Sequence, residues 1–228
     1  MLFVKLFLFQ TLRYFIIGGG ALIILNVWAK ERFKKYRIQE SQIKKQQLLS
    51  EIKYSISTLL IFSVFYSTIL DPRFSTYIRL YSDFKDYPIW WNLLTVPFLL
   101  IFHDTYFYWM HRTLHHRFFY RKFHSVHHLS TNPTPLASFS FHPVEAILET
   151  IWILPLLIFF PIQKYILLSF AFISFLNNIK GHLGFDFSRH KYGILNSSFH
   201  HSMHHRHFNS NYGLYFLFWD KICKTEKV

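Results

Sequence analysis

The sequence has little cysteine, glycine or proline. Cys223 is the single cysteine among 228 residues, so an internal disulfide and cysteine-based metal or redox motifs are excluded. Glycine and proline appear only 7 and 8 times, and no run alternates between apolar and polar residues. Because strands carry that alternation and need turn residues between them, the sequence predicts an all-α fold.

Charge is also scarce, and acidic charge most of all. Charged residues make up 16% of the chain and hydrophobic ones 51%. A soluble domain carries about 25% charged residues, whereas lipid solvates an apolar exterior without them. Lysine and arginine outnumber the acidic residues by 25 to 12, but they lie between apolar runs rather than on one soluble face. We therefore expect a membrane protein with no nucleic-acid partner.

Five apolar runs are expected to form membrane helices, because about 20 helical residues cross a hydrocarbon core. They cover residues 2–29, 54–70, 88–110, 144–161 and 162–179. The first run lacks a small-residue cleavage site at its end, which favours a membrane helix over a signal peptide. The sequence thus predicts a multi-pass membrane helical bundle.

The loops between these runs predict the orientation of the chain. Residues 30–53 are rich in lysine and arginine, so we expect a helical connector on the cytoplasmic side. Residues 71–87 have balanced charges and are expected outside. The last two runs then act as a hairpin, and all the histidine clusters face the cytoplasm in a His-rich cap.

Histidine is abundant, with 15 copies, and most of them form three clusters. The clusters are His111 and His115 in the spacing HxxxH, then His124, His127 and His128, and finally His201, His204 and His205, both in the spacing HxxHH. Residues three or four apart share one face of a helix, so each cluster presents its imidazoles together. Neutral imidazole binds Fe, Zn, Cu and Ni. Eight imidazoles exceed the ligands that one ion takes, so the spacing predicts two metals.

The other histidines differ in their positions. His182 follows an apolar run on the same predicted side and is expected to be a ninth ligand. His142 and His200 remain open as ligands. His103 is eight residues before the first cluster, on a different face of the helix, and is expected to line a cavity. We do not expect His116, His190 or His207 to bind metal.

No cluster contains a carboxylate at ligand spacing. An all-imidazole site favours nearby carboxylates that accept hydrogen bonds from the imidazole N–H groups. The available acidic residues are Asp104, Glu145, Asp186 and Asp220, with Glu149 as a weaker choice. No catalytic residue beyond the metal site is predicted.

These motifs resemble the fatty acid hydroxylase/sterol desaturase superfamily, and most closely its sterol C-5 desaturase-like members. Residues 103–116 and 123–128 resemble its first two histidine boxes. Residues 136–146 resemble the stretch that follows, residues 181–184 surround the isolated histidine, and residues 200–205, 211–213 and 218–220 resemble the third box and C-terminal signature. The resemblance covers residues 90–228, which we expect to be the catalytic domain, after membrane helices and a basic connector in residues 1–89.

The resemblance implies a diiron enzyme that uses O2 to hydroxylate or desaturate a sterol or fatty-acyl lipid. No G-x-G-x-x-G dinucleotide fingerprint is present. We therefore expect electrons from a separate protein, either a b-type cytochrome or a ferredoxin with its reductase. An endoplasmic-reticulum membrane and a bacterial inner membrane fit equally well.

Two other functions are less well supported. A zinc-dependent membrane hydrolase would need a motif such as H-E-x-x-H, which the sequence lacks. A histidine-rich metal transporter would spread its ligands along a path across the bilayer rather than gather them at one end.

Overall fold

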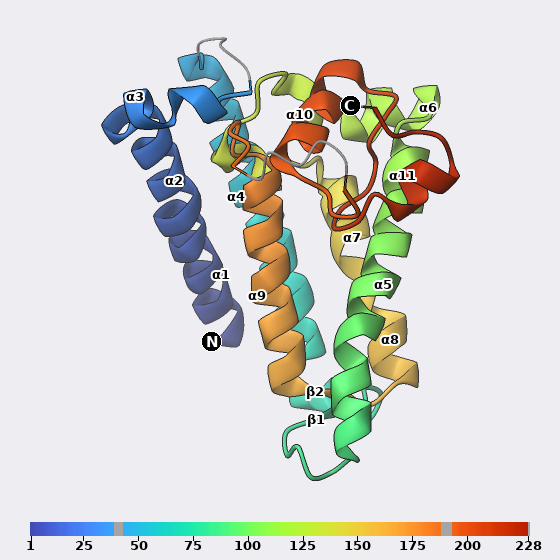
Figure 1. The fold of residues 1–228 in the computed structure, drawn as a ribbon. Coiled ribbons are helices and arrows are strands. Elements are labelled where there is room, and N and C mark those ends of the chain that lie inside the picture. Colours follow the sequence, from blue (N-terminus) through green and yellow to red (C-terminus); the bar gives the residue numbers. More distant parts are fainter. Residues whose placement is uncertain (39–42, 188–192, 228) are drawn as a thin grey trace.

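The computed structural model describes residues 1–38, 43–187 and 193–227, and in it long helices run side by side beneath a cap of short segments (Figure 1). The long helices are α1 (Leu2–Arg13), α4 (Lys45–Ile69), α5 (Ile89–Leu114) and α9 (Lys164–Gly181). The cap contains α6 (Arg117–Phe119), α10 (Ser198–His207) and α11 (Phe218–Ile222). The structure is thus mostly helical, which confirms the predicted helical fold class.

The N-terminal helix continues beyond α1 to Trp28. It passes through π-helical turns at Tyr14–Gly19 and Ile24–Trp28, with α2 (Gly20–Ile23) between them. A Cβ on Gly18 would lie 3.5 Å from the carbonyl oxygen of Pro135, in ordinary van der Waals contact, so the helix lies directly against the backbone at Pro135. The helix packs on α4, where the Gln10 amide donates to the Ser63 hydroxyl at 2.7 Å.

The basic connector is shorter than predicted. It contains α3 (Lys30–Phe33) and a 3₁₀ turn at Lys34–Tyr36, and α4 already begins at Lys45. Part of the predicted connector, residues 39–42, lies outside the described residues. The α4 helix therefore extends well before the apolar run at 54–70, because helix-forming lysine, glutamine and leucine residues precede that run.

The prediction of one helix over residues 144–161 is wrong. The run is divided into two helices, α7 (Pro143–Ile151) and α8 (Ile153–Phe159). Pro155 has no N–H to donate to the carbonyl of Ile151, and its ring crowds that carbonyl. The helix breaks there, at Trp152.

The structure also contains a small sheet that the sequence did not predict. At the end opposite the cap, β1 (Leu80–Tyr81) pairs in parallel with β2 (Ile162–Gln163). The register joins Leu80 to Ile162. Runs of two residues are too short for an alternating pattern to reveal them.

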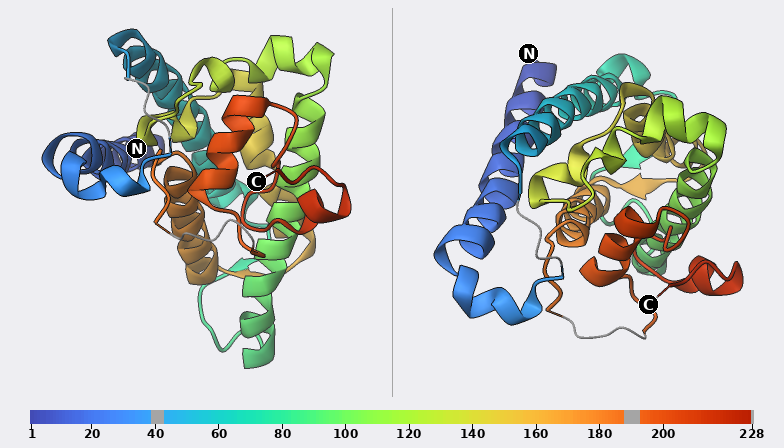
Figure 2. Two further views of the ribbon diagram at one scale, coloured as in Figure 1. Left: turned by 45° about the horizontal axis from the view of Figure 1, so that its top comes forward. Right: turned by 90° about the horizontal axis from the view of Figure 1, so that it is seen from above.

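Short helical turns complete the described chain. They are 3₁₀ turns at Pro72–Phe74, His127–Leu129 and Pro135–Phe139, and a π turn at Tyr120–His124. One apolar core joins α1, α4, α9 and the turn at Pro135–Phe139, and a second joins α5, α8 and α9. Viewed from the capped end, helix α10 lies beside the segment that follows α5 (Figure 2).

Two helical stretches among the described residues are long and apolar enough to cross a membrane. They are Leu2–Trp28, with 27 residues, and Lys45–Ile69, with 25.

Candidate metal centre

The HxxxH cluster lies on the last turn of α5. His111 and His115 are one turn apart on one face, and the helix ends at Leu114. His111 is buried, whereas His115 is half-buried. The helix thus delivers both rings to the region beneath the cap, as their spacing predicts.

The first HxxHH cluster does not lie on an α-helix, contrary to expectation. His124 ends a π turn, and His127 and His128 begin a 3₁₀ turn. All three rings are nonetheless buried, at 1–4% exposure. The backbone changes its winding between His124 and His127.

The second HxxHH cluster lies on α10, which begins with an N-cap. The Ser197 hydroxyl accepts from the backbone N–H of His200 at 3.4 Å, a common way to start a helix. His182 directly follows the last residue of α9 and is 2% exposed. Both elements therefore bring their rings to the same capped end.

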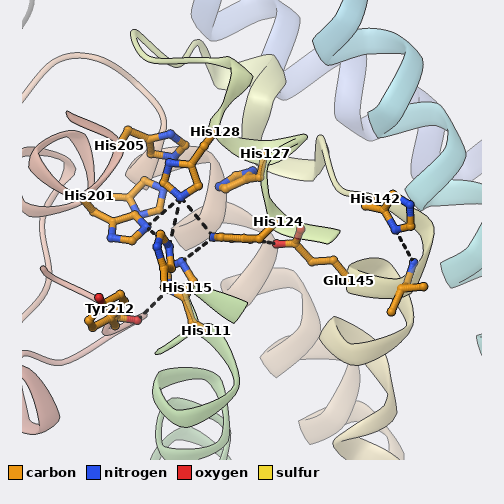
Figure 3. Close-up of polar contacts among 12 residues, drawn as sticks. His111, His115, His124, His127, His128, His142, Glu145, His201, His205 and Tyr212 are labelled. Carbon is orange, nitrogen blue, oxygen red and sulfur yellow. Dashed lines mark hydrogen bonds and ion pairs between the residues drawn. The ribbon is translucent and has the colours of Figure 1, made fainter. Parts of the chain in front are cut away.

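Five of these rings turn one nitrogen toward a common centre, and we call them the five-histidine group: His111, His115, His124, His128 and His204. Their facing nitrogens all lie within 4.8 Å of one another. Neighbouring Nε2 atoms are 3.2 Å apart between His111 and His124, and 3.1 Å apart between His124 and His128. Figure 3 shows the rings of His111, His115, His124 and His128 pointing toward one another.

The remaining four predicted ligands form a second centre, the four-histidine group: His127, His182, His201 and His205. The Nε2 atoms of His182 and His201 are 2.9 Å apart, and those of His201 and His205 are 3.1 Å apart. His127 completes the group at 3.3 Å from His182. The structure thus brings all nine predicted ligands together, in two groups.

Each HxxHH cluster contributes to both groups. Its two histidines four residues apart join one group, and the histidine between them joins the other. His124 and His128 belong to the five-histidine group while His127 belongs to the four-histidine group, and α10 shows the reverse division. The two groups are therefore neighbours that share the same two segments.

The spacing within each group fits a metal ion. Two imidazole nitrogens bound to one ion at about 2.1 Å lie about 3.0 Å apart at a right angle and about 3.4 Å apart at the tetrahedral angle. The Nε2 separations of 2.9–3.3 Å fall in this range or just below it. The donor set is entirely nitrogen, which suits iron, zinc, copper and nickel.

Acceptors behind the rings fix which nitrogen faces the centre. Nδ1 of His111 donates to the Tyr212 carbonyl at 3.1 Å, and Nδ1 of His204 donates to the Ser210 carbonyl at 2.6 Å. Nδ1 of His124 lies 2.7 Å from the Glu145 carboxylate (Figure 3). Since these oxygens only accept, each Nδ1 carries the proton and each Nε2 presents a lone pair.

This proton arrangement leaves lone pairs facing each other. His111 and His124 both keep their proton on Nδ1, so no proton lies between their Nε2 atoms, which are 3.2 Å apart. Two buried lone pairs at that distance repel unless a cation lies between them. The geometry of the rings therefore matches a centre built to hold positive charge.

Burial keeps the rings in the neutral form that a metal needs. It lowers the pKa of His111 to about 4, and it also lowers the pKa of His182 to about 4. Burial likewise lowers the pKa of His204 and His205 well below the ordinary value. At neutral pH the groups hold uncharged imidazoles, whose lone pairs are available to a cation.

The predicted carboxylates take different roles. Glu145 accepts from a histidine ring, as expected. Asp104 instead accepts from the backbone N–H of Tyr215 at 2.7 Å, and Asp220 accepts from the N–H of Tyr212 at 2.9 Å. Asp186 accepts from the Ser197 hydroxyl at 3.5 Å. Asp104 and Asp220 thus hold the C-terminal segment that carries the Tyr212 carbonyl, so they support the centre indirectly.

The other histidines lie outside both groups. Nδ1 of His103 bonds the Tyr215 hydroxyl, and its ring stacks on Trp152 at 4.1 Å. His142 caps α7, where its Nδ1 accepts from the N–H of Val144 (Figure 3). His200 bonds the Ser197 hydroxyl, so it is His201 that joins a group. His116 and His207 are exposed, and His190 lies outside the described residues.

An apolar cavity of about 250 Å³ leads to the histidines. Phe62, Phe107, Trp152 and Phe170 line its walls, and His111, His124, His127, His182 and His201 lie along it as well. His103 also lines the cavity, as predicted. An elongated apolar ligand could therefore lie in the bundle with one part beside the rings.

The sequence did not reveal the backbone acceptors of the centre. The carbonyls of Tyr212, Ser210 and Asn178 each receive a histidine Nδ1–H. The segment 211–213 stood out only through the family resemblance. A Cβ on Gly213 would overlap the carbonyl of Phe216, so only glycine permits this tight turn beside Tyr212.

Comparisons with known proteins agree with this geometry. A profile described as fatty acid hydroxylase matches residues 96–225. The chain is 34% identical to human lathosterol oxidase over 190 residues, which is 81% of this chain and 63% of that protein. It is 34% identical to the Delta(7)-sterol 5(6)-desaturase of Leptosphaeria maculans over 230 residues, which is 97% of this chain and 60% of that protein. The chain thus spans less than two thirds of these relatives. No solved structure gives a significant match.

Proposed function

Because the chain belongs to the fatty acid hydroxylase family, we propose that it is a membrane-bound diiron oxidoreductase that uses O2 to oxidise a sterol C–H bond. The observation that carries the proposal is the pair of adjacent imidazole groups at the end of an apolar cavity. Lipid oxidation needs both features, a redox metal centre and an apolar site that guides the substrate to it.

The nine histidines are the proposed iron ligands. The five-histidine group would hold one ion and the four-histidine group the other. Two iron ions supply the oxidising power toward an unactivated C–H bond that no side chain provides. The protein's own part is to aim the imidazole lone pairs, exclude water by burial and hold the lipid against the centre.

The substrate and reaction type are proposed from the relatives. Two of them are named lathosterol oxidase and Delta(7)-sterol 5(6)-desaturase, so we propose a sterol substrate and a desaturation that leaves a new double bond. A fatty-acyl substrate and hydroxylation are the alternatives. The aromatic walls of the cavity suit the rigid, apolar rings of a sterol.

We propose that the helices cross the membrane as a multi-pass bundle. Large apolar side chains are exposed on α5 and α9 as well as on the N-terminal helix, for example Leu93 at 66%, Ile173 at 55% and Ile16 at 63%. Exposed apolar surface of this extent is typical of lipid contact. The histidine groups would then face the cytoplasm, in the endoplasmic reticulum or a bacterial inner membrane.

A separate protein is the proposed source of electrons. Several basic residues are exposed on the cap helices and on the π turn that ends at His124: Arg117, Arg121, Lys122, Arg206 and Lys221. Such a surface favours an acidic partner, such as a b-type cytochrome or a ferredoxin supplied by its reductase. We keep residues 90–228 as the proposed catalytic domain and residues 1–89 as its membrane-anchoring part.

The proposal is tested on the purified full chain. We expect about two iron ions per chain, in line with two coordination groups, and O2-dependent conversion of lathosterol to a product with one more double bond when a cytochrome and reductase are supplied. A single zinc ion with no iron would contradict the proposed metal centre. Two irons with conversion of fatty-acyl lipids alone would contradict the sterol assignment.

A further inference from the structure

Most polar side chains in the cavity already have partners within the protein. His103 and Ser174 line the cavity, and both bond the Tyr215 hydroxyl. The amides of Asn177 and Asn178 donate to backbone carbonyls. These groups therefore have little capacity left for a ligand.

Glu149 is different. It lines the cavity and is half-buried, yet it takes part in no hydrogen bond or ion pair within the described part of the chain. The nearby hydroxyl of Tyr106 donates to the Leu148 carbonyl and so does not supply one. A carboxyl group among apolar walls without a partner costs free energy, which a hydrogen-bonding ligand restores.

Glu149 also lies close to the proposed reaction site. It follows Glu145 by four residues on α7, so it is on the same helix face and about 6 Å further along the axis. Glu145 bonds His124 of the five-histidine group, and Figure 3 shows its side chain reaching toward that ring. A ligand atom held by Glu149 would therefore keep the adjoining carbon skeleton beside the histidine groups.

We propose that Glu149 binds the hydroxyl group of a lipid alcohol and so fixes which carbon of the substrate faces the metal centre. This inference rests on the proposed function, in which the substrate is a sterol and hence an alcohol. Glu149 acts as a specificity-determining residue, and it takes no part in holding the metal. The surrounding Phe62, Phe107 and Trp152 offer the rest of the lipid only apolar contacts.

Competition binding tests the proposal without relying on turnover. The full-length protein in lipid nanodiscs is loaded with tritium-labelled lathosterol, which is then displaced by unlabelled lathosterol or by its O-methyl ether. The ether lacks the donor hydrogen but keeps the rings. We expect wild-type protein to need about 10-fold more ether than alcohol, because the hydrogen bond from the alcohol to the Glu149 carboxyl oxygen is lost.

Two variants and one control identify the acceptor. In Glu149→Leu the ratio between ether and alcohol should fall to about one, since no acceptor remains. Glu149→Gln keeps an amide oxygen and should give a ratio below wild type but above that of the leucine variant. Glu31→Gln changes an exposed carboxyl on α3 and should keep the wild-type ratio.

The ratio separates recognition from damage to the fold, because a misfolded cavity weakens both ligands together. If Glu149→Leu does not fold, Glu149→Gln decides by the same comparison. An unchanged ratio in a folded Glu149 variant overturns the proposal, as does equal competition or no saturable binding in wild type. Wild-type preference for the alcohol without conversion of lathosterol would instead contradict the proposed function and leave this inference standing.

Discussion

At the residue scale, the atoms behind each imidazole matter as much as the ring. A carboxylate behind His124 was predictable, because an all-nitrogen centre favours an acidic neighbour and Glu145 was one of few nearby in the sequence. The carbonyls behind His111 and His204 were not, because every residue has a carbonyl and the side chain does not reveal where it points. Residue identity thus predicts which rings gather better than it predicts the hydrogen-bond acceptors behind them.

Removing one ligand from either group should reduce the iron content. We expect His204→Ala to lose iron from the five-histidine group and His127→Ala from the four-histidine group, so that each variant retains one iron or less. Activity should fall by about 100-fold or more, beyond the loss typical of a residue that merely supports a ligand. Elemental analysis measures the iron.

His207→Ala is the matched control, because His207 is exposed on the same helix as His204. It should retain both irons and full activity. Two irons in His204→Ala would show that this ring is not a ligand.

The bond between Glu145 and His124 predicts a smaller effect. Glu145→Gln should weaken iron binding by about 10- to 100-fold, because a neutral amide polarises the ring less than a carboxylate does. Competition with a chelator measures the affinity. Glu226→Gln, a change at a half-buried carboxyl in the C-terminal segment, should leave it unchanged. Equal chelator resistance in Glu145→Gln and wild type would contradict a role for the carboxylate.

At the scale of elements, spacing predicted which histidines gather but not their division between the groups. On a regular helix His124 would face the same side as both His127 and His128, so the pattern alone does not assign the three rings to different centres. His127 separates from the other two across the π and 3₁₀ turns, and His204 likewise separates from His201 and His205 on the regular helix α10. The division therefore depends on how each segment packs against its neighbours, which no local pattern encodes.

Packing against α4 is one source of that constraint. Glu51 of α4 is 1% exposed and accepts from Ser130 at 2.7 Å and from Thr134 at 2.5 Å. It also accepts from Gln47 at 2.8 Å. This buried carboxyl ties the chain that follows His128 to a helix outside the matched family profile.

Glu51→Ala should therefore destabilise the protein. We expect the free energy of unfolding to fall by about 2 kcal/mol, because buried hydroxyl donors lose their acceptor. That loss corresponds to about 4–8 °C in melting temperature for a chain of this size. Thermal unfolding in detergent measures it.

Glu31→Ala serves as the comparison, since Glu31 is exposed, and it should melt within about 1 °C of wild type. A Glu51→Ala protein that melts like wild type would show that the hydrogen bonds contribute little to the fold.

At the scale of the whole molecule, the histidine-bearing segments meet at one end of the bundle although they are far apart in sequence (Figure 1). Apolar runs and loop charges predicted that meeting before any contact was known. The small sheet at the opposite end and the break between α7 and α8 were not predicted, since both depend on only a few residues. Long apolar runs can thus be predicted from the sequence, whereas a two-residue strand or a single helix break cannot.

The proposed orientation can be measured by labelling. In a Cys223→Ser background, single cysteines at Lys34 and Asn209 should react with a membrane-impermeant reagent from the cytoplasmic side only, because both belong to predicted cytoplasmic segments. A cysteine at Lys85, in the balanced loop, should react from the other side. Opposite sides for Lys34 and Asn209 would contradict the proposed topology.

The sharing of each HxxHH segment between two groups has a consequence for how the protein acquires its metals. An ion that binds one group orders backbone that also carries ligands of the other, so the second ion meets rings already in position. Loading should therefore be cooperative, and chains with a single ion should be rare at intermediate metal concentration. The same coupling would keep two bound ions at a constant separation, because neither segment could shift without disturbing both groups.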